Sequence, residues 1–377
     1  MNKNNLFWIV IATLILSCST GKKALQKGDY FSAVTKAVER LKSDPDNKKA
    51  NQVLKEGYPM ALNWSQEELD FALTTNGAFK WEAAVNLMLK VNRLSDLIRS
   101  TPAARKIIKN PKTYSSELNM AIEKAAEERY NAGLIELEHQ TQEAARIAFD
   151  HFSRTDQLIP GYKDVFQKLE IAKEIATVKV IVEAITVHTQ KYKLSSEFFY
   201  NQVFEFLNNK FPNEGFVNFY SPQQAETFKI EQPDFVVRME FFDFSVGNVT
   251  RKEKEETVKK RVEINTKDTS KTEYNTYLAK LKTYTDEVVS GGRLNLKIVD
   301  FQTNNLLRDN LIPGSFTWVN DYAIFAGDIE ALDKKQLDLT KRKVISLPPE
   351  QDLFIEFTKP IFKQLTNQLN NFFRKYR

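Results

Sequence analysis

The sequence predicts an all-helical N-terminal domain with a repeat-like array of helices, followed by an α+β domain whose antiparallel sheet is closed by a C-terminal helix. Two observations support this prediction. From Lys22 to Ala176, apolar residues recur at three- and four-residue spacing, which is the period of an amphipathic helix. After Ala176, apolar and polar residues alternate, which is the period of a strand. We therefore expect a helical domain over residues 24–176 and an α+β domain over residues 177–377.

Prolines divide the helical region into segments of ordinary helix length. Proline cannot continue a helix, and it biases the residue before it away from helical backbone angles. We expect helix breaks at Pro45, Pro59, Pro102, Pro111 and Pro160. Helices joined by such breaks predict a run of antiparallel helical hairpins.

Two stretches of this region resemble tetratricopeptide repeats. The first covers residues 24–45 and carries Gly28, Asp29, Tyr30, Ala33, Ala37 and Pro45. It departs from the pattern at Arg40, where a small residue is usual. The second covers residues 125–165 at looser spacing, with Tyr130, Gly133, Ala144, Ala145, Phe149, Phe152 and Pro160. The resemblance implies a degenerate helical-repeat domain, with an unrelated bundle as the alternative, and it leaves open whether residues 62–122 contain true repeats.

The α+β domain is predicted from changes of period along the chain. Residues 178–182 alternate and predict the first strand, whereas residues 195–211 have the period of a helix. Further strands are expected at residues 234–250, 256–266, 274–290, 294–300 and 316–325.

Turn residues place the boundaries between these strands. Gly291-Gly292 predicts a hairpin turn, because glycine reaches the positive φ that such turns require. Asn304-Asn305 predicts a second turn. Pro348-Pro349 then precede an amphipathic helix over residues 350–376, whose apolar face should cover the sheet.

Residues 195–310 loosely resemble the α/β core of two groups of outer-membrane lipoproteins. These are the curli-secretion type and the lipoprotein activators of peptidoglycan synthases. The resemblance rests on Pro233-Asp234-Phe235-Val236-Val237 and on Leu296-Lys297-Ile298-Val299-Asp300-Phe301. It implies a lipoprotein that works with other envelope proteins.

The N-terminus resembles that of a bacterial lipoprotein precursor. An apolar run from Leu6 to Leu16 is too short to span a bilayer, which needs roughly 20 residues, and has the length of a signal-peptide core. It ends in Ile15-Leu16-Ser17-Cys18, which resembles a lipobox. The resemblance implies cleavage after residue 17, a diacylglyceryl lipid on Cys18 and a short tether over residues 18–23. An ordinary signal peptide is the alternative.

The expected cellular location and the composition limit the classes of protein to which this chain can belong. Cys18 is the only cysteine, so the chain cannot form an internal disulfide. By analogy with lipoprotein sorting, Ser19 favours the outer membrane, and we expect a periplasm-facing protein. The formal net charge of +5 is modest for 377 residues and does not indicate a nucleic-acid partner.

No pattern for catalysis or for a cofactor stands out, so we expect a protein that is not an enzyme and that carries no group beyond its lipid. His139, His151 and His188 lack the spacing of a zinc site, and no phosphate-binding loop or G-x-S-x-G occurs. Carboxylates such as Asp300, Asp309, Asp321 and Asp328 could form a glycosidase pair only if the fold brings two of them together.

Two groups of aromatic residues follow turn-forming residues and are candidate partner contacts. They are Trp318 with Tyr322, and Phe216 with Tyr220. Tryptophan and tyrosine dominate protein-binding hot spots. The alternative is that these side chains pack under the sheet.

Three functions remain from the sequence. The first is a lipid-anchored periplasmic scaffold or adaptor that binds envelope proteins, with the repeat domain and the α+β domain docking different partners. The second is a subunit of an oligomeric export or envelope-assembly complex, in which case the protein is a homo-oligomer. The third is a glycan or peptidoglycan hydrolase.

Overall fold

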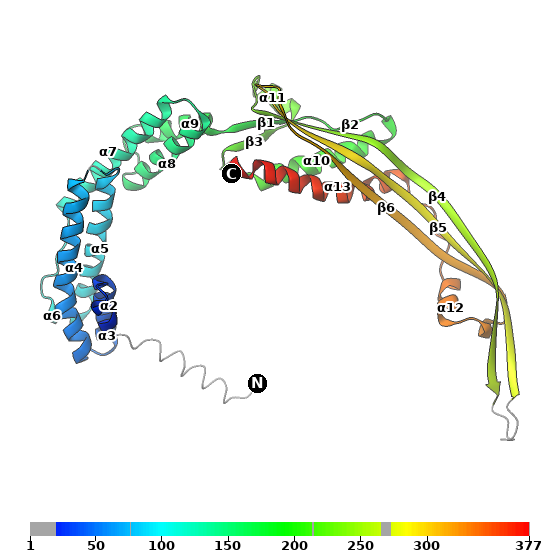
Figure 1. Cartoon of the computed structure of the whole chain (residues 1–377), viewed down its shortest axis with the longest axis horizontal. Coiled ribbons are helices and arrows are strands. Elements are labelled where there is room, and N and C mark those ends of the chain that lie inside the picture. The colour runs from blue at the N-terminus through cyan, green and yellow to red at the C-terminus, as the bar shows by residue number, and fades with distance from the viewer. Residues whose placement is uncertain (1–19, 76, 213–214, 265–272, 377) are drawn as a thin grey trace. The chain divides into compact units, whose positions relative to one another are not determined.

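The computed structural model divides into two compact units between Ala176 and Thr177 (Figure 1). It describes residues 20–75, 77–212, 215–264 and 273–376. Cys18 and the expected signal peptide lie outside the described residues. The first unit is helical, and the second combines a sheet with helices, so the predicted fold class is confirmed.

Eight helices form the described part of the first unit. They are α2 (Lys22–Gln26), α3 (Tyr30–Ser43), α4 (Lys48–Thr74), α5 (Lys80–Ser100), α6 (Pro102–Ile107), α7 (Ser116–Glu138), α8 (Gln142–Leu158) and α9 (Val165–Ala176). Several of these helices begin after a polar residue whose side chain accepts a hydrogen bond from a backbone N–H group that would otherwise be unpaired. Asp29, Asn47 and Thr141 do so for α3, α4 and α8.

The expected break at Pro59 is wrong, because Pro59 lies inside α4. An internal proline costs a helix about 3 kcal/mol. Packing on both sides of this point offsets that cost, since Leu54, Tyr58 and Ala61 are all buried. The Tyr58 hydroxyl also accepts a hydrogen bond from the Lys112 backbone N–H at 2.7 Å, which ties α4 to the loop before α7. The other four prolines stand at or between helix ends.

Charged side chains join the middle helices of this unit. The Glu82 carboxylate of α5 accepts from Arg129 Nε of α7 and from Arg154 Nε of α8, each at 2.6 Å. Burial raises the pKa of Glu82, but the hydrogen bonds from the two guanidinium groups outweigh it and hold the pKa below its usual value.

Close approach of α7 and α8 depends on Gly133, where a Cβ would lie 2.7 Å from the Phe152 ring.

The described part of the second unit contains six strands and the helices that pack against them. Its strands are β1 (Val178–Val182), β2 (Thr186–Val187), β3 (Val217–Tyr220), β4 (Phe235–Ile264), β5 (Glu273–Asp300) and β6 (Leu306–Gly327). Its α-helices are α10 (Lys193–Lys210), α11 (Pro222–Thr227), α12 (Lys334–Thr340) and α13 (Glu350–Phe373), and short 3-10 turns occur at Gln190–Tyr192, Ile329–Ala331 and Arg374–Tyr376.

The sheet is mixed, in the order β3-β1-β4-β5-β6, and β2 also pairs with β4. The three long strands β4, β5 and β6 are antiparallel, as the sequence predicted for the sheet. Parallel pairs join β1 to β3 and to β4, and join β2 to β4. The strand expected at residues 274–290 is confirmed as part of β5, and Asn304-Asn305 lie in the turn between β5 and β6.

The hairpin turn expected at Gly291-Gly292 is wrong, because both glycines lie within β5. A Cβ at Gly292 would lie 2.3 Å from Cβ of Phe244, and one at Gly314 of β6 would lie 2.4 Å from the Phe357 backbone oxygen. These glycines therefore serve close packing against β4 and α13 rather than a turn.

Helices α10 and α13 lie on the same side of the sheet (Figure 1). Phe354, Phe357, Ile361 and Leu365 of α13 are fully buried in one core with Leu294, Leu296 and Ile312 of the strands. Further along the hairpin, α12 packs on the opposite face of the strands, against a smaller cluster that includes Leu281 and Ala323. The long strands are therefore buried where α13 or α12 packs on them, whereas residues 251–263 of β4 and 306–311 of β6 contain no buried residue.

Substituting Gly314 by alanine tests the approach of α13. The added methyl group has no room beside the Phe357 backbone oxygen and Ile361, so we expect a loss of about 1–3 kcal/mol in the free energy of unfolding. Thermal unfolding followed by circular dichroism measures it. The neighbouring exposed Ser315→Ala should change stability by less than about 0.5 kcal/mol. Equal midpoints for the two variants would contradict this account of the packing.

Candidate functional site

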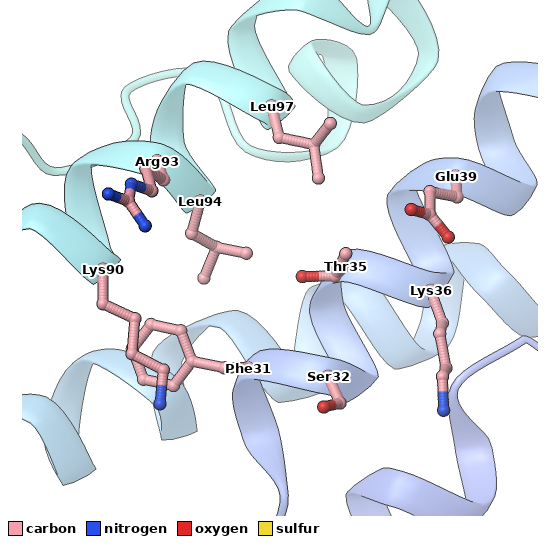
Figure 2. Close-up of a pocket in the computed structure, with 9 residues that line it drawn as sticks. All are labelled: Phe31, Ser32, Thr35, Lys36, Glu39, Lys90, Arg93, Leu94 and Leu97. Atoms are coloured by element: carbon pink, nitrogen blue, oxygen red, sulfur yellow. The ribbon is translucent and has the colours of Figure 1, made fainter. Parts of the chain in front are cut away.

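A groove of about 550 Å³ lies between α3 and α5 of the helical unit (Figure 2). Its floor is apolar: Phe31 and Leu94 are buried, and Leu97 is half-buried. On α3, the lining residues Phe31, Thr35 and Glu39 are four residues apart. Residues at this spacing lie on the same side of a helix. The lining residues of α5 also recur at three- and four-residue spacing, and they are Lys90, Arg93, Leu94 and Leu97.

Aromatic rings hold one of the rim cations in place. The Lys90 ammonium group lies 4.2 Å from the centroid of the Phe31 ring and 5.2 Å from that of Trp64. The two rings meet edge to face, with centroids 5.9 Å apart. A cation over ring faces is attracted by about 0.5–1 kcal/mol at an exposed site. The ammonium group is thus positioned at the groove without being neutralised.

The rim of the groove is positively charged. Lys36, Lys90 and Arg93 are exposed, and none of them forms an ion pair with any residue that the structure describes. Glu39 is the single carboxylate of the lining. The hydrogen bonds from Ser32 lower the pKa of the nearby Asp29, and the charges of Lys90 and Lys36 lower it further. An apolar floor below unpaired cations can bind a segment that carries both apolar and acidic side chains.

Sequence reasoning did not identify this groove. Residues 24–45 carry the repeat-like signature, and residues 62–122 show only the helical period. The available signal was the placement of Lys36, Lys90 and Arg93 beside the apolar stripes of two neighbouring helices. That signal becomes informative only when the two helices are known to be in contact.

The aromatic residues that sequence reasoning selected fall into two separate places. Trp318 and Tyr322 lie on β6, at one edge of the sheet, whereas Tyr220 lies on β3, at the other edge, and Phe216 directly precedes β3. All four are buried or half-buried rather than exposed. The Tyr220 ring contacts the Phe228 ring, and the Phe216 backbone N–H donates a hydrogen bond to the backbone carbonyl oxygen of Tyr376. Phe216 and Tyr220 therefore do not extend the surface around Trp318.

Trp318 and Tyr322 lie on one face of β6 with Asn320 between them. Tyr322 is stacked on Tyr284 of β5, with ring centroids 4.9 Å apart. Next to this pair, Arg251 of β4 holds the buried Asp286 carboxylate by two hydrogen bonds of 2.5 and 2.9 Å. These bonds keep the pKa of Asp286 below its usual value. The face thus places aromatic rings around a paired charge.

Other polar groups are engaged in the structure. His151 Nδ1 lies 3.1 Å from Arg129 Nη1, and His188 Nε2 lies 2.6 Å from the Glu240 carboxylate. Asp300 and Asp328 accept hydrogen bonds from the backbone N–H groups of Thr303 and Leu278. Within the described ranges, no group of three or more His, Cys, Asp or Glu side chains is arranged to hold a metal ion. None of the described helices is both long and apolar enough to cross a membrane.

Comparisons with known proteins give little similarity. The chain matches no protein-family model and no curated protein. A solved structure that aligns with it is described as a neuraminyllactose-binding hemagglutinin homolog from Helicobacter pylori. That structure is 14% identical, with a TM-score of 0.25, and the alignment covers 51% of this chain and 86% of that one. Similarity at this level supports no functional conclusion.

Asp286→Asn tests the charge pair on the strands. Because the folded-state pKa of Asp286 is lowered, the pair stabilises the fold above the pKa of the unfolded chain and loses this effect as the pH falls through the folded pKa. We expect Asp286→Asn to lower the thermal midpoint at about pH 7 and to flatten its decline between about pH 5 and pH 3.

The exposed Asp309→Asn on β6 is the matched control, since it removes a carboxylate from the same sheet without a buried partner. Its midpoint should follow that of the wild type at each pH. Identical pH profiles for Asp286→Asn and the wild type would show that the pair does not contribute to stability.

Proposed function

We propose that the protein is a non-catalytic, lipid-anchored adaptor that binds envelope proteins at the periplasmic face of the outer membrane. The observation that carries this proposal is the groove between α3 and α5, with its apolar floor and three unpaired cations. Its partner is an amphipathic segment that places apolar side chains on Phe31 and Leu94 and carboxylates near the cations. A lipid on Cys18 would tether this groove at the membrane and raise the local concentration of the bound partner.

Binding fits the groove better than hydrolysis does. Paired-acid glycoside hydrolysis uses two carboxylates about 5–9.5 Å apart, and Glu39 is the single carboxylate among the groove residues. A rim of cations over a buried aromatic ring is instead suited to recognition, because opposite charges steer and orient a partner while apolar contacts retain it.

A second candidate function is a subunit of an oligomeric envelope-assembly complex. One observation favours it: β6 is an edge strand of 22 residues that, within the part of the chain that the structure describes, pairs with β5 alone. Long exposed edges offer unpaired backbone groups to another chain.

Charge reversal at the groove tests the adaptor. We expect the triple variant Lys36→Glu, Lys90→Glu and Arg93→Glu to lose envelope proteins that the wild-type lipoprotein recovers from native membranes, because the acidic segment is repelled. Recovery by the wild type should also fall as salt is raised, since exposed charges are screened over about 8 Å at physiological ionic strength. Mass spectrometry of the captured proteins measures both effects.

A matched variant, Lys48→Glu, Lys49→Glu and Lys55→Glu, changes the net charge equally on exposed positions of α4 in the same unit. It should capture the wild-type set of proteins. Equal loss in both variants would mean that overall charge matters and the groove does not. Capture of nothing by the wild type would refute the adaptor.

The anchor has its own test. We expect Cys18→Ala to abolish incorporation of labelled fatty acid and to shift the protein from the membrane fraction to the soluble fraction. Ser17→Ala keeps a small residue before the cysteine and should leave labelling intact. Labelling that persists in Cys18→Ala would exclude Cys18 as the lipidated residue.

A further inference from the structure

The free edge of β6 has one stretch that is suited to strand pairing. Pro313 and Gly327 bound residues 314–326, and Asp321 is the single charged residue between them. Pro313 has no backbone N–H to donate to β5, and its backbone oxygen accepts a hydrogen bond from Gln364 of α13 at 3.0 Å, so the backbone groups of residue 313 belong to the open edge. Since backbone direction alternates along a strand and the β5–β6 register is regular here, the odd-numbered residues 315–325 point their backbone groups to the open edge.

The other free edge of the long strands is different. Among the described strands, β4 pairs beyond Phe241 with β5 alone. All but two of the residues from 251 to 261 are charged, which is a usual protection against strand addition. Residues 314–326 carry no such protection, and Val319 and Ile324 are each more than half exposed.

We propose that two copies of this chain pair through residues 314–326 of β6, antiparallel, about a two-fold axis at Asn320. Asn320 is the middle residue of the stretch, so this register pairs its whole length with itself. Asp321 then lies opposite Val319 of the second copy rather than opposite another carboxylate, and Trp318 lies opposite the second copy's Tyr322. A two-fold contact is closed, so it ends at a dimer.

The amide of Asn320 gives this register a second basis. Asn320 is 6% exposed, and its Nδ2 atom is buried without a hydrogen-bond partner. An unsatisfied buried donor costs about 1–3 kcal/mol. In the proposed register, the two Asn320 side chains lie on the same face, directly opposite each other, with Cβ atoms about 4.5–5.5 Å apart. Rotation of the amides lets each copy satisfy the other.

This pairing is independent of the groove between α3 and α5, so either proposal can fail while the other holds. It predicts a dimer for the full-length chain carrying Cys18→Ala in mild detergent, measured by sedimentation equilibrium. Val319→Pro removes an N–H that points to the open edge and not to β5, so the variant should fold with a dissociation constant raised about tenfold or more. A monomeric wild type at every concentration would overturn the proposal.

Cysteine cross-linking tests the register, since Cys18→Ala leaves no other thiol. Asn320→Cys should form an intermolecular disulfide under mild oxidation, because residues facing each other on the axis have Cα atoms within the 4.4–6.8 Å that a disulfide needs. Val319→Cys is more exposed, yet it meets its own copy only diagonally, at about 7–8 Å. It should cross-link several times less on a non-reducing gel.

Equal cross-linking at both positions would indicate random collision and overturn the register. Failure of Asn320→Cys to cross-link, with a wild-type melting profile, would overturn it as well. If Asn320→Cys does not fold, the sedimentation experiment on the wild type and Val319→Pro decides between dimer and monomer.

Discussion

The second unit depends on the contact between α13 and two glycines of the sheet. Phe357 and Ile361 reach the strands because Gly292 and Gly314 have no side chains in the way. The three long strands run for 22 to 30 residues, whereas about 5–6 is usual. Helix α13 can therefore cover only part of their length. Beyond α13, side chains of neighbouring strands contact each other instead. Arg251 of β4 pairs with the buried Asp286 of β5, and Tyr284 of β5 stacks on Tyr322 of β6.

The two proposed surfaces recognise partners by different physics. The groove of the helical unit relies on side chains: cations around an apolar floor, whose contribution salt weakens. The edge of β6 relies on backbone groups, which pair with any compatible strand and take their specificity from the side chains opposite. A protein with both could hold a partner through one unit and a second copy through the other. Each surface belongs to a single unit, so neither proposal needs a particular arrangement of the two units.

Local patterns predicted the elements and failed where a contact between distant residues decides. The helical period and the alternation correctly indicated α10, α13 and the strand at residues 274–290. Gly291-Gly292 has the composition of a turn, but both glycines lie within β5, where Gly292 leaves room for Phe244 and α13. Pro59 has the composition of a break, but the buried residues around it keep α4 continuous. In both cases, tertiary packing outweighs the local preference.

Side-chain spacing is a local property, so the sequence alone was sufficient to predict a helical region, a region of strands and a closing amphipathic helix. It also marks Cys18 as the expected site of lipid attachment. Which helices become neighbours is not local, and only the fold brings Lys36 of α3 and Lys90 of α5 to one groove. The same holds for Trp318. Its residue type suggested a contact, but its position on an edge strand with one open side, beside the buried amide of Asn320, follows from the order of strands in the sheet. That order is set by packing between residues far apart in the chain.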